Sequence, residues 1–97
     1  MKKPINHIIE NDIETYFTKQ VKLHHGECFK FVSPSNRGVP DRIVILNGHT
    51  VFVELKAPDE KPRKLQVAVI KKMIRAGADV RVIDTKEKVD DFIKNLI

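Results

Sequence analysis

Two carboxylates and a lysine stand in this chain at a spacing that suits a divalent cation and a phosphodiester. Glu54 comes thirteen residues after Asp41, and Lys56 follows Glu54 by two positions. The sequence Asn47-Gly48 lies midway between the carboxylates, with β-branched apolar runs on both sides. Asn-Gly in that setting predicts a β-hairpin, because a type I′ turn needs positive φ at both central residues.

A two-residue turn would fix the register of the hairpin, and counting outward from it places Asp41 opposite Glu54. Opposed side chains lie about 4.5–5.5 Å apart at Cβ, where like charges are destabilising. A bound Mg²⁺, which takes oxygen ligands at about 2.0–2.1 Å, would offset that repulsion. Lys56 projects from the same face as Glu54, because side chains alternate along a strand. A three-residue turn would instead place Asp41 opposite Leu55.

The positive charge of the chain is concentrated directly after these residues. The net charge is +5, and the segment from Lys56 to Arg75 carries seven positive and two negative side chains, which account for the whole excess. A basic stripe beside paired carboxylates is what a partner with a phosphate backbone requires. A solvated helix face is the alternative reading of the charge run.

Length and composition indicate one globular domain over residues 1–97. We expect no membrane segment, because no apolar run approaches the roughly 20 residues that a spanning helix needs. The single cysteine, Cys28, has no partner within the chain, so we expect a reducing, cytoplasmic setting.

The expected order of elements is α-β-β-β-α-β-α. Helical spacing covers about 5–23 and 62–76, and a last helix begins near 84 or 85. Strands are expected at 28–32, on both sides of the Asn-Gly turn, and at 80–83. The crossover from the second hairpin strand to the last strand should be parallel, which gives a mixed central sheet flanked by helices. Both faces of the hairpin are largely apolar, so we expect helices to cover both.

Other polar side chains are placed to join Asp41 and Glu54. Glu14 lies at the border of the apolar stripe of the first helix, with Glu10 one turn earlier as the alternative. Gln66 lies one turn into the second helix, and Lys30 lies in the first strand. For each, an ordinary surface or boundary role remains open.

Segments 38–42 (GVPDR) and 53–58 (VELKAP) together resemble the signature of the VRR-NUC family, the virus-type replication-repair nucleases of the PD-(D/E)xK nuclease superfamily. The resemblance extends over nearly the whole chain, including the early helical glutamate and Gln66. It implies a single-domain, restriction-endonuclease-like α/β fold. It also implies hydrolysis of DNA phosphodiester bonds with Mg²⁺ or Mn²⁺.

In this reading, Asp41 and Glu54 hold the metal, helped by the Leu55 carbonyl and by Glu14. Lys56 orients the attacking water or stabilises the transition state, and Gln66 belongs to the same site. Virus-borne single-domain members tend to be homodimers similar to Holliday-junction resolvases, so the resemblance implies branched DNA and a host cytoplasm. The expected phosphate contacts are Lys30, Arg37, Arg42, Lys61, Arg63, Lys64, Lys71 and Lys72. The competing hypotheses are a catalytically silent nucleic-acid-binding module that uses the basic stripe from Lys61 to Arg75, and a small adaptor protein.

Overall fold

Three helices and four strands follow one another in the part of the chain that the computed structural model describes, which is residues 5–97 for the backbone and residues 12–97 for side chains. Glu10, the alternative to Glu14, falls outside the described side chains. The elements are α1 (Ile5–Leu23), β1 (Glu27–Lys30), β2 (Arg42–Leu46), β3 (His49–Leu55), α2 (Lys64–Arg75), β4 (Val80–Ile83) and α3 (Lys86–Leu96). The order is the one that the sequence predicts.

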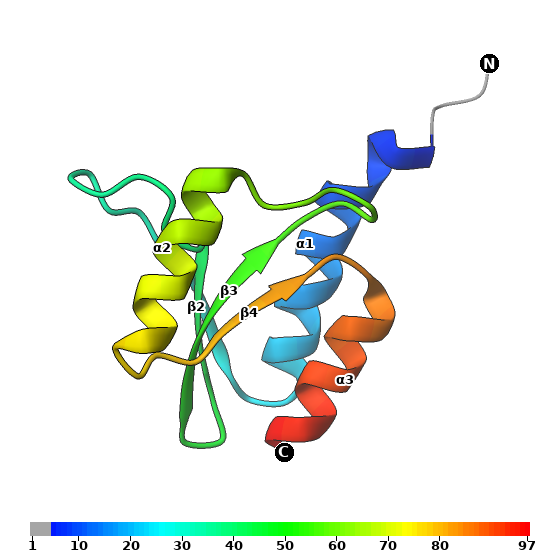
Figure 1. The fold of residues 1–97 in the computed structure, drawn as a ribbon. Helices are drawn as coiled ribbons and strands as arrows, with labels where there is room; N and C mark the ends of the chain where they lie inside the picture. Colours follow the sequence, from blue (N-terminus) through cyan, green and yellow to red (C-terminus); the bar gives the residue numbers. More distant parts are fainter. Residues whose placement is uncertain (1–4) are drawn as a thin grey trace.

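The four strands form one mixed sheet in the order β1-β2-β3-β4 (Figure 1). β2 pairs antiparallel with β1 and β3, whereas β3 and β4 are parallel, as a helical crossover between them requires. The hairpin turn has two residues, with φ of 51° at Asn47 and 81° at Gly48. The turn is also fastened to the end of α3, because the Asn47 side-chain amide donates to the Leu96 carbonyl at 2.7 Å.

One face of the sheet carries the main core beneath α1 and α3 (Figure 1). Side chains alternate along a strand, so every second residue of β2 and β3 points to this face. Val44, Val51 and Val53 are fully buried there. Between α1 and α3, the ring centroids of Phe17 and Phe92 lie 5.5 Å apart. The rest of the core consists of Ile13, Val21, Leu46, Leu55, Ile83, Val89, Ile93 and Leu96.

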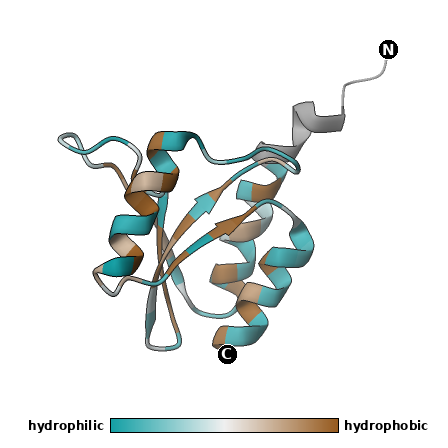
Figure 2. Ribbon diagram, in the orientation of Figure 1, coloured by the Kyte–Doolittle hydropathy of each residue, from teal (hydrophilic) through white to brown (hydrophobic). Residues whose placement is uncertain are grey.

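α2 lies on the other face of the sheet, so helices flank both faces as expected, but it covers this second face only in part. α2 is a single helix of 12 residues that packs beside β4, and it leaves this face of β1 and β2 open. Phe29 on β1 is 52% exposed and Ile45 on β2 is 45% exposed. Apolar and polar residues alternate in bands along α2 and α3 (Figure 2), as expected for helices with one face toward a sheet. No helix in residues 5–97 is long and apolar enough to span a bilayer.

Candidate active site

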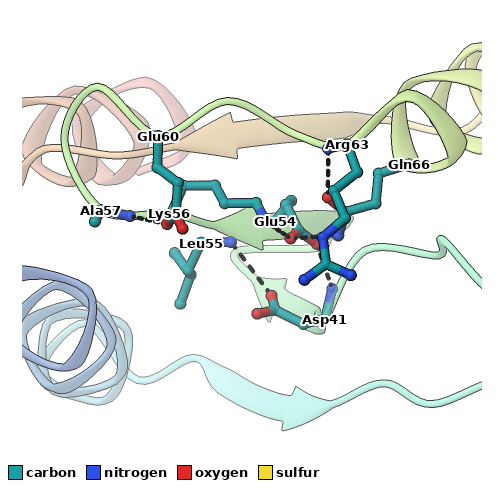
Figure 3. A network of polar contacts seen from close by, with 8 residues as sticks. All are labelled: Asp41, Glu54, Leu55, Lys56, Ala57, Glu60, Arg63 and Gln66. Carbon is teal, nitrogen blue, oxygen red and sulfur yellow. Dashed lines mark hydrogen bonds and ion pairs between the residues drawn. The ribbon is translucent and has the colours of Figure 1, made fainter.

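The hairpin brings Asp41 and Glu54 together at its open end. Arg42 opposite Val53 is the last pair in the ladder, so Asp41 and Glu54 occupy the next opposed positions, as predicted. The Asp41 backbone N–H donates to Glu54 Oε1 at 3.2 Å, and the Leu55 N–H donates to Asp41 Oδ1 at 3.3 Å (Figure 3). Each carboxylate is therefore held by the backbone of the opposite strand.

This pair carries more negative charge than its surroundings balance. Glu54 is 3% exposed and Asp41 is half-buried. Burial, and then the charge of Glu54, raise the pKa of Asp41 from 3.8 to about 6, despite the opposing effects of the Leu55 N–H and Arg42. Two hard carboxylate donors with uncompensated charge suit Mg²⁺ or Mn²⁺. The donor set therefore fits the metal that the sequence predicts.

Lys56 and Gln66 converge on one oxygen of Glu54. The Lys56 ammonium lies 3.3 Å from Glu54 Oε2, and only 12% of its side chain is exposed. The Gln66 amide nitrogen donates to the same oxygen at 2.8 Å (Figure 3). A lysine held in a largely dry site stays close to the carboxylates and gives a fixed positive charge where a phosphate could bind.

The start of α2 fixes the side chain of Gln66. Arg63 is extended, with φ of −67° and ψ of 160°, and its backbone N–H donates to Gln66 Oε1 at 2.9 Å. This bond is half of a capping box, in which the third helical residue accepts from the backbone of the capping residue. The amide oxygen is thereby turned toward the helix end, and the amide nitrogen is left for Glu54.

Glu14 and Arg42 meet on the opposite side of the sheet. Arg42 shares a face with Val44, so its side chain points toward α1, where Nη2 lies 3.6 Å from Glu14 Oε2. Glu14 is close enough to add slightly to the raised pKa of Asp41. Within the described residues, no three of His, Cys, Asp and Glu lie close enough to share a metal. The structure therefore unites Asp41, Glu54, Lys56 and Gln66, and holds Glu14 beside them in an ion pair.

Arg42 requires a correction. The sequence placed it among the phosphate contacts, but it is 8% exposed, and its Nε has no hydrogen-bond partner in the described part of the chain. Its position in β2 turns it inward, so we assign it to Glu14. The alternation that buries Val44 and Leu46 is the signal in the sequence that could have revealed this pairing.

The remaining expected phosphate contacts are on the surface. All of them are exposed: Lys30, Arg37, Lys61, Arg63, Lys64, Lys71 and Lys72. Lys30 is paired with Arg42 in the ladder, so it shares the sheet face opposite to the one with Glu54. The basic residues of α2 lie on the same side of the sheet as Glu54, and they are better placed for DNA bound there.

Comparisons with known proteins agree with this geometry. No family model matches the chain. A protein of Acyrthosiphon pisum secondary endosymbiont phage 1 named "Putative nuclease p44" is 43% identical over 81 residues, which cover 82% of this chain and 87% of that protein. A solved structure described as a VRR_NUC domain superposes with a TM-score of 0.83 at 28% identity, and the match covers 91% of this chain and 97% of that one. The resemblance seen in the two signature segments is thus confirmed, and the chain belongs to the VRR-NUC family of nucleases.

Proposed function

We propose that this protein is a metal-dependent endonuclease that hydrolyses DNA phosphodiester bonds at the site of Asp41, Glu54 and Lys56. The observation that carries the proposal is the opposed pair of carboxylates with the pKa of Asp41 raised to about 6. A pair of this kind is costly to fold without a cation, so its presence supports a site built to receive one. Membership of a nuclease family supports the same conclusion.

Asp41 and Glu54, with the Leu55 carbonyl, are the groups that would hold Mg²⁺ or Mn²⁺. Glu14 would contribute directly or through water if it leaves Arg42. When bound, such an ion lowers the pKa of its water and offsets charge that develops on the phosphate. Asp41 is suited to this role because a nearby cation would remove the unfavourable interaction that raises its pKa in the structure.

Lys56 would act on the phosphate or on the attacking water. Its ammonium is already positioned by Glu54 Oε2, so little reorganisation is needed when charge develops on a phosphate oxygen. Gln66 would serve as a positioning residue, because its amide restrains the Glu54 oxygen that Lys56 also contacts. Their side chains bring one positive and one neutral donor to the buried carboxylate.

We further propose that the substrate is branched DNA and that the active species is a homodimer similar to Holliday-junction resolvases. Each copy offers one candidate site and one basic helix, and a two-fold pair would present two sites to a substrate with two-fold symmetry. Exposed apolar residues such as Val32 and Ile45 supply surface that a small domain leaves uncovered.

Cleavage assays on defined DNA structures test these proposals. Four-way junction, flap, duplex and single-stranded DNA are each incubated with Mg²⁺, Mn²⁺ or chelator, and light scattering reports the oligomeric state. We expect metal-dependent cleavage that favours branched DNA, by a dimer. DNA binding without cleavage in either metal would favour the silent binding module. A monomer that cuts linear duplex best would refute the resolvase-like specificity and leave the nuclease standing.

A further inference from the structure

An apolar groove of about 410 Å³ lies between α2, the sheet and the loop that follows β1. Its walls are two aromatic rings of the sheet face, Phe31 and Phe52, and the aliphatic side chains of Val39, Val69 and Met73. Ser33, Asn36 and Lys72 add polar groups to the lining. A groove of this size can accept a small ring system, and it contains no acidic residue.

The groove lies next to the candidate active site. Phe52 precedes Glu54 by two residues on β3. Its side chain therefore points to the same face of the sheet, at a position about 6.6–6.8 Å from that of Glu54 along the strand. The Phe31 backbone N–H donates to the Asp41 carbonyl at 2.8 Å. Any group in the groove would therefore lie beside a phosphate bound at Asp41 and Glu54.

α2 connects the two regions as well. Val69, Met73 and Ala76 line the groove, and they follow Gln66 at spacings of three, four and three residues. Residues at this spacing form one stripe on a helix. The stripe therefore begins at Gln66, which contacts Glu54 at 2.8 Å, and continues along the groove.

The chemistry of the walls favours a flat ring attached to a polyanion. Phe31 and Phe52 are half-buried, with ring centroids 5.5 Å apart and planes at 54°, so they form two sides of an aromatic corner. α2 has no acidic residue, and its charged residues are Lys64, Lys71, Lys72 and Arg75. Aromatic rings within a basic surface are the usual means by which proteins hold unpaired bases, because every base has a flat face for stacking.

We propose that this groove binds an unstacked nucleobase that flanks the phosphate held at Asp41 and Glu54. The inference rests on the proposed nuclease function and refines its substrate. A base that is paired and stacked within a duplex cannot enter without being extruded, which costs a few kcal/mol. The groove therefore favours strands whose bases are already unpaired, such as single strands, flaps and the nucleotides next to a branch point.

The test compares two short strands with the same backbone, an oligothymidylate and its fully abasic counterpart, by fluorescence anisotropy in Ca²⁺, a divalent cation that binds oxygen ligands. We expect the wild-type protein to bind the strand with bases roughly 5- to 150-fold more tightly, the range that stacking of one base supplies. Equal affinity for the two strands, or no measurable binding of either at low salt, would overturn the proposal. This comparison needs no variant.

Substitutions then locate the effect. Phe31→Leu removes a groove ring and should abolish the preference for bases while leaving abasic affinity unchanged; Phe31→Tyr keeps the ring and should retain the preference. Phe29→Leu is the matched control, because Phe29 is an exposed ring on the same sheet face outside the groove. Thermal melts check that each variant is folded. An equal loss in Phe29→Leu would refute the assignment.

Light scattering separates the groove from a subunit contact. A dimer that becomes a monomer in Phe31→Leu would show that a second copy, and not a base, fills the groove. Cleavage in Mn²⁺ is scored separately. A protein that prefers bases but never cuts would refute the nuclease and retain the groove, whereas a nuclease without the preference would refute the groove alone.

Discussion

Replacing Asp41 by asparagine should stabilise the protein at neutral pH when no metal is present. The pKa of Asp41 is raised from 3.8 to about 6, which is about two units. At about 1.4 kcal/mol per unit, this difference sets an upper limit of about 3 kcal/mol on the cost of ionising the carboxyl in the folded state. Asp41 is only half-buried, and solvent screening reduces the expected cost to about 1–2 kcal/mol.

The sign of this effect follows from proton linkage. Between about pH 4 and pH 6 the folded protein holds the Asp41 proton more tightly than the unfolded chain, so the free energy of unfolding falls as the pH rises. Above that window the full cost is present, and below it the cost vanishes. Asp41→Asn cannot ionise, yet its amide oxygen can still accept from the Leu55 N–H. The variant should therefore gain about 1–2 kcal/mol at about pH 7.5 and nothing near pH 4.

Thermal unfolding in chelator measures this difference. In a domain of this size about 1 kcal/mol shifts Tm by about 4–8 °C, so the gain is readily detected. Asp91→Asn is the matched control, because it removes the same charge from an exposed position on α3. Added Mn²⁺ should raise the Tm of the wild-type protein and not that of Asp41→Asn, since binding to the folded state alone is stabilising. An Asp41→Asn variant that is no more stable than wild type at neutral pH would refute the reasoning from charge repulsion.

Three further outcomes are expected. Asp41→Ala and Glu54→Ala should abolish cleavage while the fold persists, and calorimetric titration that shows unchanged Mn²⁺ binding in both would contradict the metal assignment. Lys56→Gln should slow the single-turnover rate far more than it weakens DNA binding, because its interaction strengthens in the transition state; a loss confined to affinity would make Lys56 a simple phosphate contact. Glu14→Gln should lower the free energy of unfolding in urea more than Arg42→Met does, because the guanidinium is the more buried partner and is left uncompensated; the reverse order would show that their pairing matters little.

The hairpin was predictable because local chemistry determines it. Asn47-Gly48 adopts positive φ at both positions, and the turn length alone fixes which residues face each other. The opposition of Asp41 and Glu54 follows without any knowledge of the rest of the fold. The same alternation also places Lys56 beside Glu54, where the structure finds it.

The surroundings of the hairpin were harder to predict. The path from β3 to α2 depends on a turn in which Asp59 has φ of 67° and the Ala57 N–H donates to Glu60 Oε1 at 3.1 Å. The path of this turn places the start of α2 where the Gln66 side chain can contact Glu54. The groove beside the site likewise requires α2 to be placed against Phe52, which periodicity alone does not determine.

The misassignment of Arg42 has a different cause. An arginine next to a candidate catalytic aspartate suggests phosphate binding by its type, while the alternation along β2 assigns it to the buried face with Val44. In the structure, the strand position of Arg42 determines its contacts and its residue type does not, because Arg42 is 8% exposed and contacts Glu14. Residue type predicts the role of a side chain well at the open end of this hairpin, as at Asp41, and poorly inside the strand, as at Arg42.

The charges around the hairpin end suggest why metal and DNA should bind together. Asp41 and Glu54 lie there on one face of the sheet and Glu14 on the other, and Lys56 pairs with Glu54 while Arg42 pairs with Glu14. One negative charge remains, and it opposes the approach of a phosphodiester. A divalent cation would reverse the sign of the site, and one phosphodiester would then bring it to neutrality. DNA should therefore bind near Asp41 far better with a divalent cation than without one, whereas contacts through the basic residues of α2 should depend on salt alone.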